Sequence, residues 1–311
     1  MIETNGLTKH YGQLVAVEDL SFRVEPGEVL GFLGPNGAGK STTMKMLAGY
    51  VSPTAGSARV CGFDIEADSL EARRVLGYLP EGAPTYPEMT PASFLTFVAD
   101  IRSLSGQTRQ TRLDEVIGLL HLESVLQQTI ETLSKGYKRR LGLAQALIHD
   151  PKVLILDEPT DGLDPNQKHE VRQLINTISQ DKIIIISTHI LEEVDAVCSR
   201  AIIIAHGKIL ADDTPDNLEA RSRFHNAVSL RLVQRAAVGQ VRAALEALPE
   251  VASVEVRENT DRLTAFPKPG TQPLTAISEL ADAQGWELSE LHLESGRLDE
   301  VFRTITGGAA S

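Results

Sequence analysis

The sequence is poor in cysteine, has no long apolar run and carries fewer basic than acidic side chains. Cys61 and Cys198 are far apart, so we expect buried, reduced thiols and neither a disulfide nor a metal site. Apolar runs such as residues 153–156 and 183–186 fall well short of the roughly 20 residues that cross a bilayer. The 30 basic and 42 acidic side chains give a net charge of −12, which disfavours nucleic acid as a partner.

In other respects the composition is that of an ordinary globular protein. Apolar residues make up 42% and charged residues 23% of the 311, which excludes extended disorder. A chain of this length is typical of about two domains. Residues 1–4 show no basic flank or apolar signal segment, so we expect the chain to stay in the cytoplasm.

Short apolar runs alternate with helical patterns in the first two thirds of the chain. Residues 28–33 predict a strand, and a glycine-rich turn and a helix through Tyr50 follow it. Three continuous apolar runs, at residues 152–156, 182–187 and 200–205, are typical of buried parallel strands. This alternation of strands and helices predicts an α/β fold.

Two further features complete the first predicted domain, residues 1–218. Residues 2–11 and 15–24 predict strands of a smaller antiparallel sheet, and residues 89–148 predict an inserted helical subdomain. A polar stretch at residues 215–226 then marks the domain boundary. We place the second domain at residues 226–311.

The second domain has the pattern of a small α+β fold. Alternating and helical apolar spacings predict the order β-α-β-β-α-β, which is the ferredoxin-like arrangement, followed by a final helix. We expect Trp286 to pack in the core of this domain.

The strongest motif follows the first predicted parallel strand and matches the pattern G-x-x-x-x-G-K-[ST]. It consists of Gly34, Pro35, Asn36, Gly37, Ala38, Gly39, Lys40 and Ser41. Glycines allow the backbone to wrap around a polyphosphate, and the following helix presents its positive end to the same anion. We expect Lys40 to reach the β- and γ-phosphates, Ser41 to bind Mg²⁺, and Thr42 to contact the α-phosphate.

Two carboxylates, Asp157 and Glu158, follow the apolar run 153–156. Ligands of open α/β sheets bind at the carboxyl ends of the strands. Asp157 can therefore hold Mg²⁺, directly or through water, and Glu158 can polarise the attacking water.

Together these residues make the chain resemble the ATP-binding cassette (ABC) ATPases, a class of P-loop NTPase, over residues 1 to about 215. Residues 133–137 resemble the family signature LSGGQ, and residues 159–164 resemble its D-loop. Residues 187–189 end a strand as the switch-histidine segment does, and residues 77–81 occupy the Q-loop position. Tyr11 stands where the family has an adenine-stacking aromatic residue.

The resemblance implies a role for each matching residue. Tyr11 stacks on adenine, and His189 contacts the γ-phosphate. Ser134 and Gly136 touch the γ-phosphate held by a second subunit, because family members close head to tail around two ATP molecules. Asp164 lies at that dimer interface.

Three positions depart from the family pattern. Glu81 replaces the usual Gln, and either side chain offers an oxygen to Mg²⁺ or water. Lys135 and Tyr137 replace a Gly and the Gln of the signature. These variants, and residues 296–302, resemble the subgroup that serves ABC-2-type permeases, which includes drug exporters and gliding-motility systems.

The resemblance implies an ATPase subunit that works as a homodimer. A separate membrane permease carries the substrate and docks on the helical subdomain and the region of Glu81, at the inner face of the cell membrane. Two alternatives remain: a soluble cassette ATPase with a non-membrane partner, or a slow regulatory module. Lys138, Arg139 and Arg140 form a basic cluster that we expect to be a solvated helix face.

Overall fold

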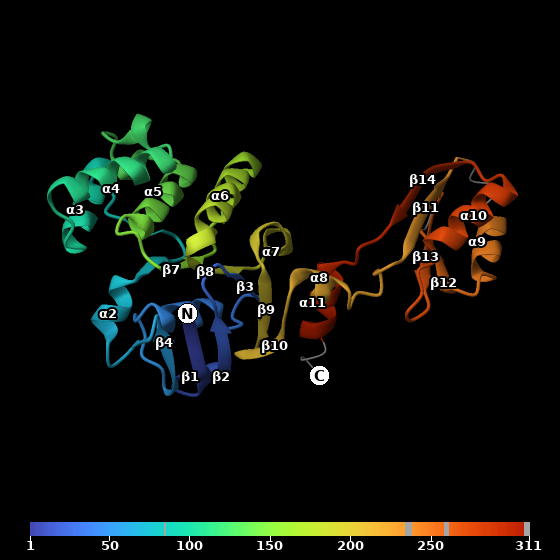
Figure 1. Ribbon diagram of the computed structural model, residues 1–311, viewed down its shortest axis with the longest axis horizontal. Coiled ribbons are helices and arrows are strands. Elements are labelled where there is room, and N and C mark those ends of the chain that lie inside the picture. The colour runs from blue at the N-terminus through green and yellow to red at the C-terminus, as the bar shows by residue number, and fades with distance from the viewer. Residues whose placement is uncertain (84, 234–237, 258–260, 308–311) are drawn as a thin grey trace. The chain divides into compact units, whose positions relative to one another are not determined.

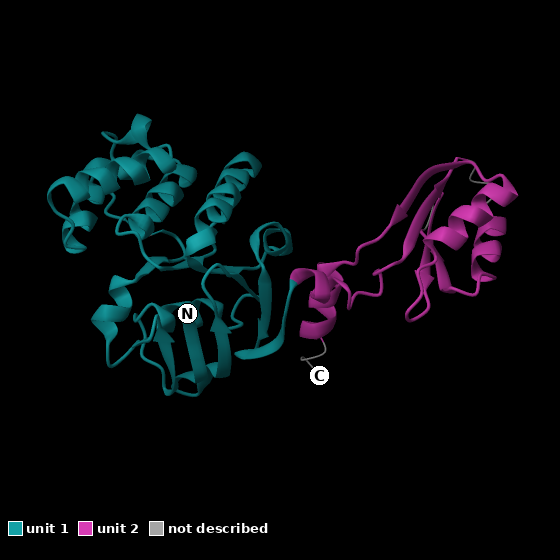
Figure 2. Ribbon diagram, viewed as in Figure 1, with its two compact units in different colours: residues 1–214 teal, residues 215–311 magenta. Residues whose placement is uncertain are grey.

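The computed structural model describes residues 1–83, 85–233, 238–257 and 261–307. The chain divides into two units, Met1–Thr214 and Pro215–Ser311 (Figure 2). The division falls four residues before the expected end of the first domain at 218, because helix α8 (Pro215–Glu219) packs against helix α11 (Leu298–Gly307) of the second unit.

A six-stranded sheet in the order β10-β9-β3-β8-β7-β6 forms the centre of unit 1 (Figure 1). Its strands are β3 (Val29–Leu33), β6 (Leu76–Leu79), β7 (Val153–Asp157), β8 (Ile183–Thr188), β9 (Arg200–Ala205) and β10 (Lys208–Asp213). All neighbours pair in parallel except β9 and β10. The carboxyl ends of β3, β7 and β8 therefore meet at one edge of the sheet.

A second, antiparallel sheet in the order β2-β1-β4-β5 packs with helix α1 against the first. Its elements are β1 (Ile2–Tyr11), β2 (Leu14–Val24), β4 (Ala55–Val60) and β5 (Phe63–Asp64), with α1 at Lys40–Leu47 and α2 at Ser69–Arg74. Apolar side chains from both sheets and from α1 share one core, in which Phe22 and Phe32 lie 5.6 Å apart between ring centroids.

The remaining part of unit 1 is helical. It comprises α3 (Pro91–Ile101), α4 (Gly106–Leu119), α5 (Lys135–Leu147), α6 (Pro165–Ile178) and α7 (Leu191–Val197), with short 3₁₀ helices at Glu123–Val125, Ile130–Thr132 and Ser179–Asp181. Helices α3, α4 and α5 gather in one lobe (Figure 1). Among the described residues, no helix combines the length and apolarity needed to cross a bilayer.

Unit 2 contains the predicted β-α-β-β-α-β order. Its elements are β11 (Val228–Leu232), α9 (Val238–Glu246), β12 (Val251–Val256), β13 (Arg262–Pro267), α10 (Leu274–Gln284) and β14 (Leu288–Leu293). The sheet order is β12-β13-β11-β14, and buried residues such as Leu230 and Ile277 form its own core, against which Trp286 packs. The predicted α/β fold with a ferredoxin-like second domain is confirmed.

Candidate functional site

The glycine-rich loop connects the end of β3 to the start of α1. Gly37 and Gly39 have φ angles of 79° and 106°, a region that favours glycine. A Cβ atom on Gly39 would lie 2.5 Å from the carbonyl oxygen of Ala16, so only glycine fits there. Gly39 also caps α1 without a side-chain hydrogen bond. The first N–H groups of α1 can therefore bind an anion.

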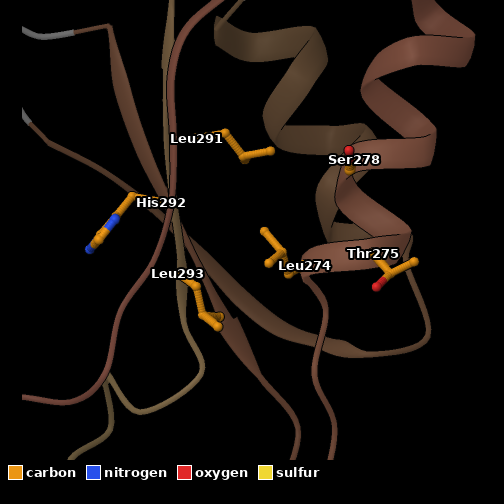
Figure 3. Close-up of a pocket in the computed structure, with 6 residues that line it drawn as sticks. All are labelled: Leu274, Thr275, Ser278, Leu291, His292 and Leu293. Atoms are coloured by element: carbon orange, nitrogen blue, oxygen red, sulfur yellow. The ribbon is translucent and has the colours of Figure 1, made fainter.

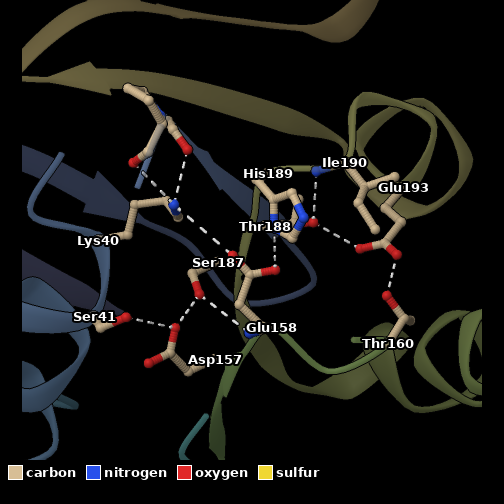
Figure 4. A network of polar contacts seen from close by, with 12 residues as sticks. Lys40, Ser41, Asp157, Glu158, Thr160, Ser187, Thr188, His189, Ile190 and Glu193 are labelled. Atoms are coloured by element: carbon tan, nitrogen blue, oxygen red, sulfur yellow. Dashed lines mark hydrogen bonds and ion pairs between the residues drawn. The ribbon is translucent and has the colours of Figure 1, made fainter. Parts of the chain in front are cut away.

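The ammonium group of Lys40 is buried beside this loop. It donates hydrogen bonds to the carbonyl oxygens of Gly34 at 2.8 Å and Pro35 at 3.3 Å, and lies 3.8 Å from Glu158 Oε1 (Figure 4). Burial lowers the pKa of Lys40, while the nearby carboxylates of Glu158 and Asp157 oppose that shift. The positively charged Lys40 side chain thus lies between the glycine-rich loop and the carboxylates at the end of β7.

Asp157 ends β7 and is fully buried. Its Oδ1 accepts hydrogen bonds from Ser41 at 3.2 Å and from Ser187, whereas its buried Oδ2 has no hydrogen-bond partner among the described residues. An unpartnered buried carboxylate oxygen beside a hydroxyl suits a hard cation, because Mg²⁺ binds through one or two protein oxygens plus water and phosphate. Asp157 and Ser41 therefore fit the predicted Mg²⁺ role.

Glu158 has a left-handed backbone, with φ at 50°. Consecutive side chains of an extended strand point to opposite faces, so this turn allows both Asp157 and Glu158 to face the loop. Such strained conformations persist only where neighbours hold them. Here the Glu158 N–H donates to the carbonyl oxygen of Ser187 at 3.0 Å.

The carboxylate of Glu158 meets the ring of His189, with 2.9 Å between Oε2 and Nδ1. Burial raises the pKa of Glu158, and the bond to His189 and the charge of Lys40 oppose that shift. A buried carboxylate with a raised pKa is a stronger base than an exposed one. The pair can accept a proton from a water molecule in the pocket.

Arg139 corrects one expectation from the sequence. It lies in α5 and is 5% exposed, so it does not belong to a solvated helix face. Its guanidinium donates to the carbonyl oxygen of Glu158 and, at 3.4 Å, to that of Pro80. The Arg139 side chain therefore connects α5, which begins within the signature segment, to the backbone of Glu158 and to Pro80, the residue before Glu81.

A second buried group, Glu193 in α7, was not singled out in the sequence. It is 2% exposed and accepts hydrogen bonds from Thr160 and, at 2.8 Å, from Thr188 (Figure 4). Thr160 follows β7 and Thr188 precedes His189. Glu193 thereby connects the loop after Glu158 to the strand end that carries His189.

Lys40, Ser41, Glu158 and His189 line a pocket of about 610 Å³. Its lining contains most of the residues that the sequence predicted, together with Leu14, Val15, Ala16 and Asp161, which it did not assign. The predicted residues in the lining are Tyr11, Asn36, Gly37, Ala38, Gly39, Lys40, Ser41, Thr42, Glu81, Glu158 and His189. Tyr11 is 47% exposed, and the Lys9 ammonium lies over its ring, 5.1 Å from the ring centroid.

Six predicted residues do not line this pocket: Gly34, Pro35, Asp157, Ser134, Gly136 and Asp164. Gly34 and Pro35 accept hydrogen bonds from Lys40, and Asp157 accepts one from Ser41, so these three are bonded to residues of the lining. The other three lie at the starts of α5 and α6. Ser134 caps α5 by accepting from the N–H of Tyr137, and Asp164 caps α6 by accepting from the N–H of Gln167 at 2.9 Å. A Cβ atom on Gly136 would lie within 2.5 Å of the Gln167 side chain. Within one chain, Ser134, Gly136 and Asp164 therefore belong to the starts of two helices and do not contribute to the pocket that contains Lys40.

Comparison with known proteins gives consistent matches. A family model described as ABC transporter matches residues 17–161. The "Probable multidrug ABC transporter ATP-binding protein YbhF" of Escherichia coli is 37% identical over 223 residues. This match covers 71% of the present chain and 38% of the Escherichia coli protein, so the chain spans less than half of that relative's length.

Another relative matches over almost the full length of both chains. The "Uncharacterized ABC transporter ATP-binding protein YhcH" of Bacillus subtilis is 31% identical over 309 residues, which is 99% of this chain and 96% of that protein. A solved structure described as "Structure of ATP binding subunit of ABC transporter" aligns with a TM-score of 0.66 and 31% identity. It covers 71% of this chain and 92% of the solved chain.

Proposed function

The chain belongs to the ABC transporter family of ATP-binding proteins, and from this premise we propose that it is the ATP-hydrolysing subunit of an ABC-2-type exporter. The observation that carries the ATPase proposal is the pocket in which Lys40, Glu158 and His189 meet the glycine-rich loop, with Asp157 hydrogen-bonded to Ser41 of its lining. Members of this family are ATP hydrolases, and the pocket has the groups that such a reaction needs.

We assign phosphate binding to the loop N–H groups and to Lys40. The N–H groups and the start of α1 hold the β-phosphate, and the Lys40 ammonium reaches toward the γ-phosphate. Mg²⁺, when bound at Asp157 and Ser41, neutralises charge on the phosphate oxygens. The half-exposed Tyr11, which also lines the pocket, stacks on the adenine.

Glu158 acts as the general base. It orients a water molecule against the γ-phosphate and takes its proton, because burial raises the pKa of this carboxyl. His189 holds the Glu158 carboxylate in place through Nδ1 and presents its other ring nitrogen to the γ-phosphate. The residues contribute chiefly by positioning and by balancing charge in the transition state.

A second copy completes each site. Ser134 and Asp164 are exposed at helix starts, where backbone N–H groups attract anions, yet neither lines the pocket of its own chain. We propose that Ser134 and Gly136 of one subunit contact the γ-phosphate bound by Lys40 of the other, with Asp164 beside the interface. Hydrolysis then requires a head-to-tail dimer.

Mixed dimers test this arrangement. With Lys40→Ala on one chain and Ser134→Ala on the other, both lesions fall in one composite site, and the second site remains active. With both changes on one chain and a wild-type partner, each site carries one lesion. Each mixed dimer is isolated from the homodimers through a different affinity tag on each chain. We expect phosphate release from the first mixed dimer at about half the wild-type rate and far less from the second. Equal rates would refute the shared-site proposal.

The exporter and permease parts of the proposal rest on other observations. Residues 77–81 and 133–137 carry the variants that resemble the ABC-2 subgroup, and the Escherichia coli relative is named as a multidrug transporter protein. The test is affinity purification of the full chain from detergent-solubilised membranes of its native cells. Recovery of a stoichiometric membrane protein supports the proposal, whereas recovery of nucleic acid or ribosomes contradicts it.

A further inference from the structure

The outer edge of strand β14 has no pairing strand among the described residues. β14 lies at the end of the unit 2 sheet and pairs with β11. Leu288 is half-buried, and the other five residues of the strand are exposed. A free edge offers a row of N–H and C=O groups to another strand.

The backbone bonds define which groups face this edge. The N–H of Glu294 donates to the carbonyl oxygen of Ala227 at 2.8 Å, and Ser229 pairs with His292 in the β11–β14 register. Because bonding direction alternates along an antiparallel strand, Leu291 and Leu293 direct their N–H and C=O groups away from β11. These groups can bind a further strand.

The side chains at this edge divide into an apolar and a polar face. Leu291 and Leu293 are 38% and 39% exposed and, with Leu274 of α10, line an open cavity of about 640 Å³. Figure 3 shows these three leucines directed into the cavity and His292 directed to the other side of the strand. On that polar face, Glu290 forms ion pairs with Arg262 and, at 3.5 Å, with Arg231.

We propose that β14 pairs antiparallel with β14 of a second copy of this chain, about a two-fold axis at Leu291. In this register Leu291 of each copy exchanges N–H···O bonds with the other, and the leucines that line the two cavities adjoin across the axis. Such isologous pairing joins the two four-stranded sheets into one continuous sheet. It also covers the exposed apolar side chains of both edges.

Charge selects this register over its neighbours. With Leu291 on the axis, Glu290 of each copy faces His292 of the other at a non-hydrogen-bonded pair, where side chains are closest. A shift in one direction places Glu290 opposite Glu290. A shift in the other places Glu290 opposite Glu294. Of these three registers, only the one with Leu291 on the axis places a hydrogen-bond donor, His292, opposite Glu290 at both of the two symmetry-related pairs.

This contact is separate from the ATP-dependent dimer proposed above, because it involves unit 2 and requires no nucleotide. The edge contact can therefore keep two copies together after ATP is hydrolysed and the nucleotide sites open.

Disulfide formation tests both the partner and the register. In a Cys61→Ser background, full-length Glu290→Cys and His292→Cys proteins are purified separately and oxidised without nucleotide, alone and mixed. Opposed residues at such a pair have Cα atoms about 4.5 Å apart, within the range that a disulfide spans. We expect several-fold more cross-linked dimer in the mixture than in either protein alone. Equal yields in the three samples would overturn the proposal.

A matched pair of substitutions at His292 gives an independent readout. His292→Lys keeps a donor opposite Glu290, whereas His292→Glu places two carboxylates together at each of the two positions. His292 is exposed, so both variants should fold, which thermal melting verifies. In nucleotide-free sedimentation equilibrium, we expect the Lys variant to self-associate like the wild type and the Glu variant at least tenfold more weakly. Identical association of the two variants contradicts the proposed contact.

Discussion

Glu158→Gln is the sharpest test of the proposed chemistry. The amide has the shape of the carboxylate and can keep its contacts to His189 and Lys40, which lie at 2.9 and 3.8 Å. It cannot take a proton from water. Loss of a general base costs about 10²–10⁴-fold in rate, or about 3 to 5 kcal/mol in activation free energy. We expect this loss in steady-state phosphate release.

The same substitution should preserve or tighten ATP binding, because it removes a negative charge beside the phosphates. Calorimetric titration with ATP and Mg²⁺ measures this, and we expect an ATP-bound dimer to accumulate in gel filtration. Glu81→Gln is the matched control, since it removes a carboxylate from the same pocket and restores the usual family residue. We expect Glu81→Gln to hydrolyse ATP within about tenfold of the wild-type rate, in line with a residue that is not the general base.

The general base should also be visible in how the rate of ATP hydrolysis by the wild-type enzyme depends on pH. Since burial raises the pKa of Glu158 above the ordinary 4.5, the carboxylate is lost to protonation at a higher pH than an exposed glutamate. The rate of ATP hydrolysis is therefore full above the raised pKa and falls as the pH decreases through it.

The Glu158→Gln rate decides the assignment of the base. If this variant released phosphate within tenfold of the wild-type rate, Glu158 would not be the general base.

Three further predictions follow from buried charges. Lys40→Ala removes the ammonium group from the loop and should weaken ATP binding by about 10- to 100-fold, since hydrogen bonds to charged groups contribute about 1.5–3 kcal/mol; unchanged calorimetric affinity contradicts this. Arg139→Met removes the hydrogen-bond donor of two backbone carbonyl groups, those of Glu158 and Pro80. The substitution should lower the free energy of unfolding by about 2 to 4 kcal/mol. Urea denaturation measures this loss, with Arg139→Lys as the partial-rescue control. His149 is half-buried and donates to the Leu76 carbonyl oxygen at 3.1 Å when neutral, and its partial burial lowers its pKa from 6.5 to about 4. As the pH falls, His149 therefore takes up a proton in the unfolded chain at a higher pH than in the folded chain. The free energy of unfolding is full above pH 6.5 and lower by about 2 kcal/mol at pH 5. His149→Gln should remove this decrease, and an unchanged pH dependence in the variant would show that His149 does not cause it.

The phosphate loop and the strand-end carboxylates could be predicted because their chemistry is local. The spacing of Gly34, Gly39 and Lys40 determines a turn and a helix start within a few residues. The apolar run before Asp157 and Glu158 predicts a buried strand that ends in acids. The β-α-β-β-α-β pattern of the second domain was likewise recognisable, because alternation and helical spacing directly reflect which side chains face a core.

The roles of Arg139 and Glu193 could not be predicted, because burial of a charged side chain depends on what packs against it. In the sequence, Arg139 stands between two other basic residues, and Glu193 stands beside another glutamate in an ordinary amphipathic helix. Their partners, the Glu158 carbonyl and the hydroxyls of Thr160 and Thr188, belong to other elements.

Local periodicity and residue chemistry are sufficient to predict the elements, their order and the residues that can bind a phosphate. The fold alone establishes which polar groups are buried together. It brought the ends of β7 and β8 to one edge, gave Glu158 its left-handed turn, and left the edge of β14 exposed. Those outcomes depend on long-range packing, which brings together side chains that are far apart along the chain.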